Sequence, residues 1–226
     1  MEQGLSRLYP DDIAPVRLSL NERIEKIRQA TARLSGVVPA PRQEWLSGVH
    51  NPWGHAANQV SAWPFLDICE SSELLERVTE VVGPDVILWD SELFLKAEAY
   101  HDFLQAGREG RYWPATPLSG AVVLIGLDGE RQTLRCIDVN QISSDDLADL
   151  NLQAGLYVIR YMSGSSHFDR DVRAAANWVA MQEQPLINYT NRPLWLVAGK
   201  DRGSNDFVTG FSSPVPMWAS NQSKEG

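Results

Sequence analysis

The sequence is poor in cysteine and histidine. Its 226 residues include two Cys and four His. Cys69 and Cys136 lie far apart and form no Cys-x-x-Cys pair, which argues against a disulfide framework and against a thiolate zinc site. Both thiols are therefore expected to be reduced and partly buried. This cysteine usage is typical of a cytoplasmic protein.

Long apolar runs and an excess of positive charge are also absent. No run approaches the roughly 20 apolar residues that span a bilayer, and the first residues lack the pattern of a signal peptide. The 20 Lys and Arg are outnumbered by 29 Asp and Glu, which gives a formal net charge of −9. Phosphate groups repel a net anion, so we do not expect non-specific binding to nucleic acid. The lack of a long apolar run makes a membrane partner unexpected as well. The sequence leaves the oligomeric state open.

Several common catalytic motifs are missing as well. The chain has no Gly-x-Gly-x-x-Gly, Walker or Gly-x-Ser-x-Gly pattern, and neither Cys has a His nearby. His50 and His55 are five residues apart in a loop, which is not the spacing of two zinc ligands on one helix or strand. Nucleotide-binding folds and nucleophilic Ser or Cys hydrolases are therefore not supported.

The composition is that of a globular protein, with 43% hydrophobic and 22% charged residues. A single domain over residues 1–226 is expected. Ser19 and Glu22 fit a capping box, which predicts a helix that ends near Gly36. A loop rich in Pro and Trp should follow.

A second helix is predicted from the apolar spacing in 74–82, with Gly83-Pro84 as its end. Residues 1–84 then form a helical and loop section, 85–211 a β core, and 212–226 a polar tail. In the first predicted strand, Ile87, Trp89, Leu93 and Leu95 should share one face. The predicted strands are Val86–Lys96, Ala121–Leu127, Thr133–Val139, Leu156–Tyr161, Ala176–Met181 and Pro193–Ala198. Many short strands after helices indicate a mainly β fold, a double-sheet jelly roll or barrel with helices outside.

Polar residues of catalytic type gather between Tyr100 and Pro114. His101 and Glu109 could ligate a metal or transfer protons, and Arg108 and Arg111 could bind an anionic substrate. The alternative is a solvated turn between strands. The candidate catalytic residues are Glu109, His101 and Tyr112, and the candidate substrate-binding residues are Arg108, Arg111 and Trp113.

A second cluster runs from Ser163 to Arg173. His167 lies in a turn at a strand end, where a metal ligand would suit, and Arg173 could hold a carboxylate. The alternative is a polar hairpin with internal ion pairs, which add little stability.

Several segments, in this order, resemble the phytanoyl-CoA dioxygenase family of Fe(II)/2-oxoglutarate oxygenases over roughly residues 65–180. The similar segments are Leu74–Val78, Val82–Trp89, Ser91–Lys96, Tyr112-Trp113-Pro114, Leu124–Asp128 and Leu152–Gly155. In the family, a helix, a Gly-Pro-Asp-type stop and a strand ending in Lys precede the metal site.

The resemblance implies a double-stranded β-helix in which two His and one carboxylate hold Fe(II), and an Arg holds 2-oxoglutarate. The family's His-x-Asp falls on Gly107 and Glu109, so Glu109 keeps a carboxylate and Gly107 offers no ligand atom. The resemblance then implies His167 and Glu109 as metal ligands, with Arg173 and Lys96 binding the co-substrate.

Three functions fit these observations. The first is an oxygenase with a non-standard metal site that hydroxylates or otherwise oxidises a small molecule. The second is a metal-independent isomerase, lyase or cyclase on the same scaffold, with Glu109 or His101 as the general base and an Arg binding an anionic group. The third is a non-catalytic binding or regulatory relative that contacts a partner through its aromatic residues. Those residues are Trp45, Trp53, Trp63 and Trp113.

Overall fold

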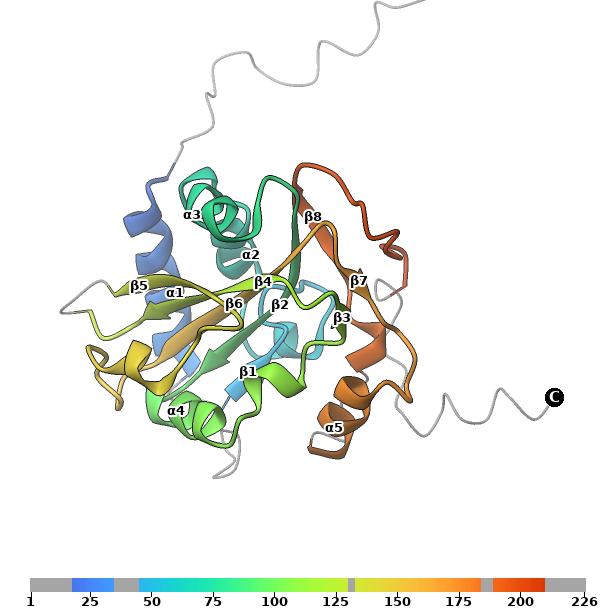
Figure 1. Cartoon of the computed structure of the whole chain (residues 1–226). Coiled ribbons are helices and arrows are strands. Elements are labelled where there is room, and N and C mark those ends of the chain that lie inside the picture. Colours follow the sequence, from blue (N-terminus) through green and yellow to red (C-terminus); the bar gives the residue numbers. More distant parts are fainter. Residues whose placement is uncertain (1–17, 35–44, 130–132, 184–188, 210–226) are drawn as a thin grey trace, which may run out of the picture.

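A computed structural model of the chain describes residues 18–34, 45–129, 133–183 and 189–209. These residues form five α-helices and eight strands (Figure 1). The helices are α1 (Leu20–Leu34), α2 (Trp63–Cys69), α3 (Ser72–Val82), α4 (Ala97–Gln105) and α5 (Ala175–Glu183). The strands are β1 (Trp45–Ser47), β2 (Val86–Phe94), β3 (Ala115–Thr116), β4 (Gly120–Gly126), β5 (Leu134–Asp138), β6 (Leu156–Ser163), β7 (His167–Phe168) and β8 (Trp195–Ala198). Short 3-10 helices cover His55–Asn58, Glu109–Arg111, Ser144–Leu147 and Tyr189–Asn191.

Six of the strands form one antiparallel sheet. Its order is β1-β2-β6-β4-β5, and β8 also pairs with β2. The long strands β2 and β6 lie in the middle and are buried along their whole length. A strand buried on both faces must be covered on both sides, which fixes the layered arrangement of the molecule.

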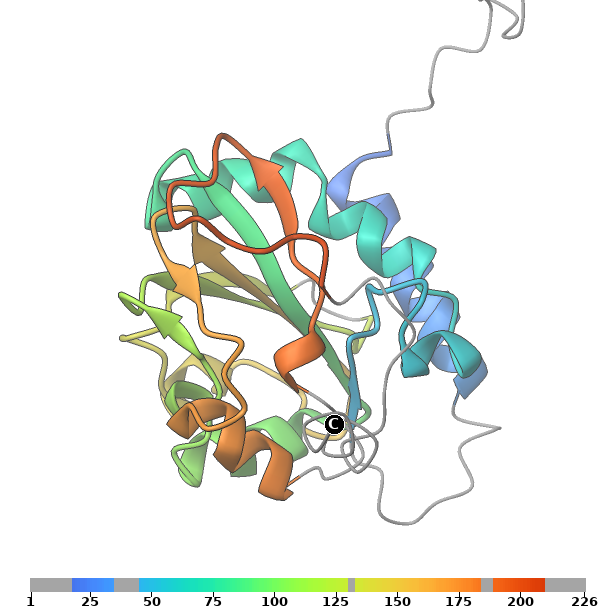
Figure 2. The same cartoon turned by 90° about the vertical axis from the view of Figure 1, so that its right-hand side faces the viewer.

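Two apolar cores lie on opposite faces of the large sheet. Helices α1, α2 and α3 cover the first face, and α4, α5 and the small β3–β7 sheet lie on the second, as the two views show (Figures 1 and 2). The second face carries most of the aromatic residues and every buried charge described below.

The predicted helices in the N-terminal section are confirmed. Ser19 and Glu22 make the capping box at the start of α1, with the Glu22 carboxylate accepting from the Ser19 backbone N–H at 2.8 Å. Helix α3 ends at Gly83, whose φ of 87° is readily adopted only by glycine. The predicted end of the first helix at Gly36 lies outside the described residues.

Five of the six predicted strands are confirmed, but the side-chain pattern of the first is wrong. A β-bulge between Leu88 and Asp90 shifts the alternation along β2. Ile87 and Trp89 therefore face the second core, whereas Leu93 and Leu95 pack with the first. A one-residue shift moves every later side chain to the other face.

Two segments have a different structure from the one predicted. Residues 176–181 belong to α5, not to a strand, since a short apolar run rich in Ala and Met suits either element. Residues 97–105, for which no element was predicted, form α4, which buries Ala97, Tyr100 and Phe103 at helical spacing. The Pro- and Trp-rich region also contains α2, and Trp53 and Trp63 are exposed there.

The fold is a mixture of helices and antiparallel sheet. A jelly roll has two facing sheets, and the described residues form one large sheet with the two-stranded β3–β7 sheet against its second face.

Cys69 is buried, Cys136 is partly buried, and both are free thiols, as expected. Among the described residues, no helix combines the length and apolarity needed to cross a membrane.

Gly120 marks the tightest contact between β4 and the second core. A Cβ atom there would lie 2.6 Å from the Trp113 ring and 2.6 Å from the backbone oxygen of Tyr161. We expect Gly120→Ala to lower the free energy of unfolding by about 1–3 kcal/mol, because neither neighbour can move away cheaply. Urea denaturation measures the loss. Gly110→Ala is the control, since a Cβ at Gly110 meets nothing within 4 Å.

Candidate functional site

Five charged side chains are buried beside the second face of the large sheet. We call them the buried charge centre: Asp90, Glu92, Glu109, Arg160 and Arg192. Charged side chains are almost never fully buried unless they are paired. Asp90 and Arg160 are directly opposite each other on β2 and β6, and Glu92 follows on the same face of β2. Adjacent strands thus place two carboxylates beside one guanidinium.

Glu109 is held in a two-pronged ion pair with Arg160. The Arg160 Nε donates to Glu109 Oε1 at 2.6 Å, and Nη2 donates to Oε2 at 2.9 Å. The Trp113 indole N–H also donates to Oε1 at 3.1 Å, and the Tyr100 hydroxyl donates to Oε2 at 3.3 Å. A carboxylate has about four lone-pair sites, so these four donors occupy the full accepting capacity of the Glu109 carboxylate.

The local backbone explains how Glu109 reaches the sheet. Helix α4 ends in a Schellman motif, in which the Arg108 N–H donates to the Phe103 carbonyl and the Gly107 N–H to the Leu104 carbonyl. Gly107 has φ of 64°, which suits glycine. The chain reverses there, and Glu109 begins the next 3-10 helix pointing inward. Gly107, which the resemblance equates with a metal-binding His, thus closes the end of α4.

The remaining nitrogen of Arg160 faces the two β2 carboxylates. Arg160 Nη1 lies 3.3 Å from Glu92 Oε2 and 3.6 Å from Asp90 Oδ2. Asp90 Oδ2 also forms a close ion pair with Arg192, whose Nη2 donates to the Ser47 hydroxyl at 3.2 Å. One aspartate therefore connects the two guanidinium groups.

Charge in the centre does not balance when every group is ionised. Three carboxylates against two guanidinium groups leave one excess negative charge. Burial raises the pKa of Glu92, and the nearby negative charge of Glu109 adds to the increase, while Arg160 opposes it. Burial lowers the pKa of Arg192 to about 9, so its guanidinium stays charged at neutral pH. A raised pKa favours the protonated form of the Glu92 carboxyl.

Aromatic rings surround the centre. Trp89 and Trp113 stack at 4.8 Å between ring centres, and Tyr100 and Phe103 stack at 5.9 Å. The Phe103 ring also lies 5.9 Å from the Arg160 guanidinium. A buried, aromatic environment strengthens electrostatic interactions among these charges.

His50 lies at the edge of the same strand. Its Nδ1 is 2.8 Å from the Ser91 hydroxyl, and its ring meets Trp195 edge-on at 4.8 Å. Burial, with the positive charge of Arg192, lowers the pKa of His50 to about 3. The imidazole is therefore neutral at physiological pH.

Three of the six residues proposed between 101 and 113 lie in the protein interior: Glu109, Tyr112 and Trp113. The structure brings Glu109 and Trp113 together, and Tyr112 packs on Phe103 at 5.2 Å. Arg108 lies 6.0 Å from the Phe103 ring, and Arg111 is exposed.

The other proposed site residues lie at or near the surface. His101 is half-buried on α4 with its Nδ1 3.7 Å from Asp102, and Lys96 is exposed just before that helix. His167 is exposed in β7, where its Nδ1 lies 2.9 Å from the Gly203 carbonyl. The Arg173 side chain is 86% exposed and pairs with Asp171 at 2.8 Å. None of these four has a contact with Glu109 among those that the structure describes.

The residues present do not fit the iron site that the resemblance implies. No group of three or more His, Cys, Asp or Glu that could hold a metal ion occurs in residues 18–34, 45–129, 133–183 and 189–209, which include all four histidines. A non-heme iron site of this kind needs two imidazoles and a carboxylate on one face of the metal. The matching carboxylate, Glu109, already has a cation beside it in Arg160.

Most of the buried charge centre was missed from the sequence. Asp90, Glu92, Arg160 and Arg192 lie within or next to strand-like runs that were read only for their apolar residues. A signal was present, because Arg160 stands in the middle of the apolar run Leu156–Tyr161. A charge in a buried strand requires an opposite charge, which points to a partner elsewhere in the fold.

No family model matches the chain, and no curated protein is significantly similar to it in sequence. Two solved structures of the non-heme monooxygenase ThoJ are similar in part. The nickel complex is 14% identical with a TM-score of 0.38, covering 84% of this chain and 80% of that one. The apo form is 13% identical with a TM-score of 0.40, covering 86% and 84%. Similarity at this level assigns neither a family nor an activity.

Removing one partner of the buried ion pair between Glu109 and Arg160 should destabilise the fold strongly. We expect Glu109→Gln to lower the free energy of unfolding by about 3 kcal/mol or more, because it leaves a buried guanidinium without its main partner. Chemical denaturation followed by far-UV circular dichroism measures this. Arg173→Gln is the matched control, since its ion pair is exposed to water and its loss should leave stability unchanged.

His50 should make the protein sensitive to acid. The unfolded imidazole binds a proton below about pH 6.5 and the folded one only near pH 3, so the unfolded state binds more protons in that window. Stability should therefore fall by about 2 kcal/mol through His50 between pH 7 and pH 4.5. Denaturation curves of His50→Gln should lack this part of the loss, whereas His167→Gln, at an exposed position, should retain it.

Proposed function

We propose that this protein is a metal-independent enzyme that transfers a proton on a small molecule at the buried charge centre. The scaffold is proposed to be a jelly roll like that of the phytanoyl-CoA-type oxygenases, which the sequence resembles. Isomerisation, elimination and cyclisation are the reaction classes that such a centre can support. The observation that carries the proposal is the pairing of Arg160 with Glu109, Glu92 and Asp90.

Arg160 supplies the positive charge that a metal ion would otherwise provide near Glu109. A guanidinium is permanently charged and cannot accept an additional ligand as a metal does. It can hold a carboxylate in place and stabilise negative charge that develops on a substrate. This favours acid–base chemistry over oxygen activation for the centre.

Glu92 is the proposed acid–base residue. Glu109 is committed to four hydrogen bonds, and Asp90 is paired with Arg192. Glu92 is buried, has a raised pKa, and has no hydrogen bond at Oε2, only the ion-pair contact with Arg160 at 3.3 Å. Its carboxylate can take a proton from a carbon acid and return it, with Arg160 holding it in position.

The proposal is tested by hydrogen exchange into D2O. A defined mixture of small metabolites is incubated with the protein in D2O containing EDTA and followed by mass spectrometry. A proton-transfer enzyme should add about 1 Da per exchanged position to its substrate, even when the net reaction is at equilibrium. We expect Glu92→Gln to abolish this exchange, and the wild-type rate to rise with pH as Glu92 ionises.

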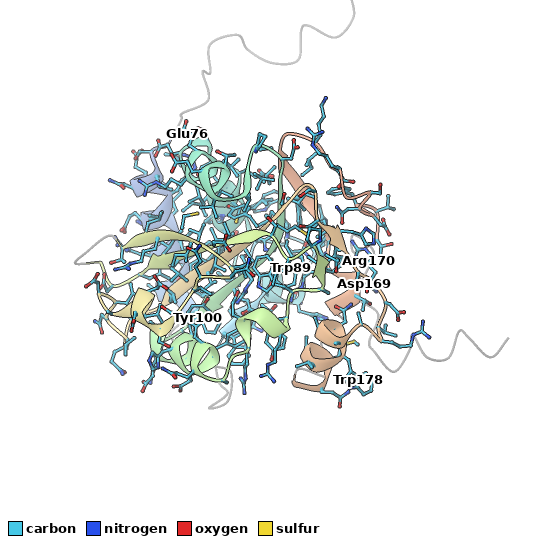
Figure 3. All side chains as sticks on the ribbon, viewed as in Figure 1. Glu76, Trp89, Tyr100, Asp169, Arg170 and Trp178 are labelled. Carbon is cyan, nitrogen blue, oxygen red and sulfur yellow. The ribbon has the colours of Figure 1, made fainter. Side chains whose placement is uncertain are left out.

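Glu76→Gln is the matched control for that experiment. Glu76 lies on the outer side of α3, far from the charge centre, and is exposed (Figure 3). Its substitution should leave exchange unchanged. Two outcomes would refute the proposal in favour of the oxygenase. One is hydrogen exchange that requires added Fe(II). The other is the gain of an oxygen atom by the substrate together with conversion of 2-oxoglutarate to succinate.

A further inference from the structure

A surface pocket lies beside the start of α2. Its volume is about 390 Å³, and its lining comes from Pro52 and the continuous stretch 57–63. Sites for small ligands usually measure roughly 300–1,000 Å³, so this pocket has room for a small molecule. Ala56 and Val60, from the same segment, are buried in the first core. The buried charge centre belongs to the second face, so the pocket is a separate site.

The backbone around the pocket is held in place by the protein itself. The N–H groups of Gln59 and Val60 both donate to the Ala56 carbonyl at 2.9 Å. Helix α2 begins directly after the lining, with Pro64 in its first turn, where the fixed φ of proline favours a helix. The pocket is therefore formed before a ligand binds, which keeps the entropic cost of binding low.

Trp63 is the largest side chain of the lining, and it is 64% exposed. It is the first residue of α2, which is anchored in the protein by other residues. Those buried residues are Phe65, Leu66, Ile68 and Cys69. Tryptophan is highly buried on average, because its ring is large and apolar. A tryptophan that lines a pocket and remains exposed there offers its ring to a ligand.

Three polar side chains of the lining are uncharged and exposed: Asn58, Gln59 and Ser61. Within the described ranges, these side chains form no hydrogen bond with the rest of the protein. Two amides and a hydroxyl can each donate and accept, either through two atoms or through one. The lining contains no charged side chain. The pocket thus suits a ligand with several neutral groups that donate and accept.

The rest of the lining is apolar, so the ligand must also have an apolar face. The apolar residues are Pro52, Ala57, Val60, Ala62 and Trp63. A pyranose ring has the same division, because its hydroxyl groups lie around the rim and its C–H bonds form a face. These C–H bonds carry partial positive charge, which the negative face of an indole ring attracts.

Other ligand classes match the lining less well. A plain aromatic group would stack on Trp63 but would leave the three polar side chains without a partner. A charged group would find no opposite charge among the lining residues, whereas bound charges are normally paired.

We propose that this pocket binds a neutral pyranose sugar, as a monosaccharide or disaccharide. Trp63 stacks on the C–H face of the ring, and Asn58, Gln59 and Ser61 bind its hydroxyl groups. The inference concerns binding only and does not rest on the function proposed for the charge centre. It adds a carbohydrate-binding site on the side of the sheet that carries the first core.

Titration with small sugars tests the proposal. The readout is the set of indole N–H signals of the full-length 15N-labelled protein, which has eight Trp. The neutral probes are methyl β-D-glucopyranoside and cellobiose. Sorbitol has similar hydroxyl groups but no ring, glucuronate and glucosamine are charged, and phenol is aromatic. High salt screens the net charge of the protein. We expect one or both neutral sugars to shift the Trp63 signal saturably, and sorbitol to leave it unchanged.

Trp63→Ala identifies the Trp63 signal by its loss and should weaken sugar binding about tenfold or more, since the stacking surface is removed. Saturation-transfer NMR on the sugar signals measures binding by this variant. Asn58→Ala should weaken binding about three- to tenfold, because it removes hydrogen bonds and keeps the indole. If Trp63→Ala does not fold, the wild-type titration and Asn58→Ala still decide the matter.

Trp178→Ala is the matched control. Trp178 is 57% exposed on the outer side of α5, away from α2 (Figures 1 and 3). Its substitution removes an exposed indole of the same kind and should leave sugar binding unchanged.

The proposal is overturned if neither neutral sugar shifts the Trp63 signal, or if sorbitol shifts it as strongly. It is also overturned if phenol, glucuronate or glucosamine binds as tightly as the neutral sugars, since the pocket then takes an aromatic or a charged group. Sugar binding that survives Trp63→Ala unchanged would place the site elsewhere. Failure of the deuterium exchange refutes only the proposed function, and failure of sugar binding refutes only this inference.

Discussion

A permanently charged guanidinium, that of Arg160, is buried in the central strand of a sheet covered on both faces. Such a charge is tolerated only with partners, and three carboxylates converge on it from β2 and from the turn after α4. The Schellman motif that ends α4 directs Glu109 inward to this guanidinium, and Trp113 and Tyr100 donate to the same carboxylate. The second core is built around it.

The same interaction separates this chain from the oxygenases that its sequence resembles. The resemblance places a metal-binding carboxylate at position 109. In the structure the Glu109 carboxylate is paired with the guanidinium of Arg160. Gly107, which stands where the family has an imidazole, closes α4 with a left-handed conformation. Gly107 offers no side-chain ligand, and the Glu109 carboxylate is already paired with Arg160.

Local patterns in the sequence predicted local structure well. The capping box of α1, the glycine end of α3 and the apolar runs of β2, β4 and β6 each depend on residues close together in the chain. One error arose where a short run suits two elements, as in 176–181, which is part of a helix; the helix 97–105 was not predicted at all. The bulge in β2 was also invisible, because it depends on pairing with β6 and not on β2 alone.

The sequence by itself determined the main strands of the sheet, the first two predicted helices, the scarcity of histidine and the carboxylate at position 109. Only the tertiary structure decided which charges meet. Glu109 and Arg160 are 51 positions apart in the chain, and His50 and Ser91 are 41 apart. Strand register and the positions of helix ends bring such distant residues together. Neither can be read from the order of residues along the chain. The physical reason is that burial makes an ion pair necessary, while the sheet determines which partner supplies it.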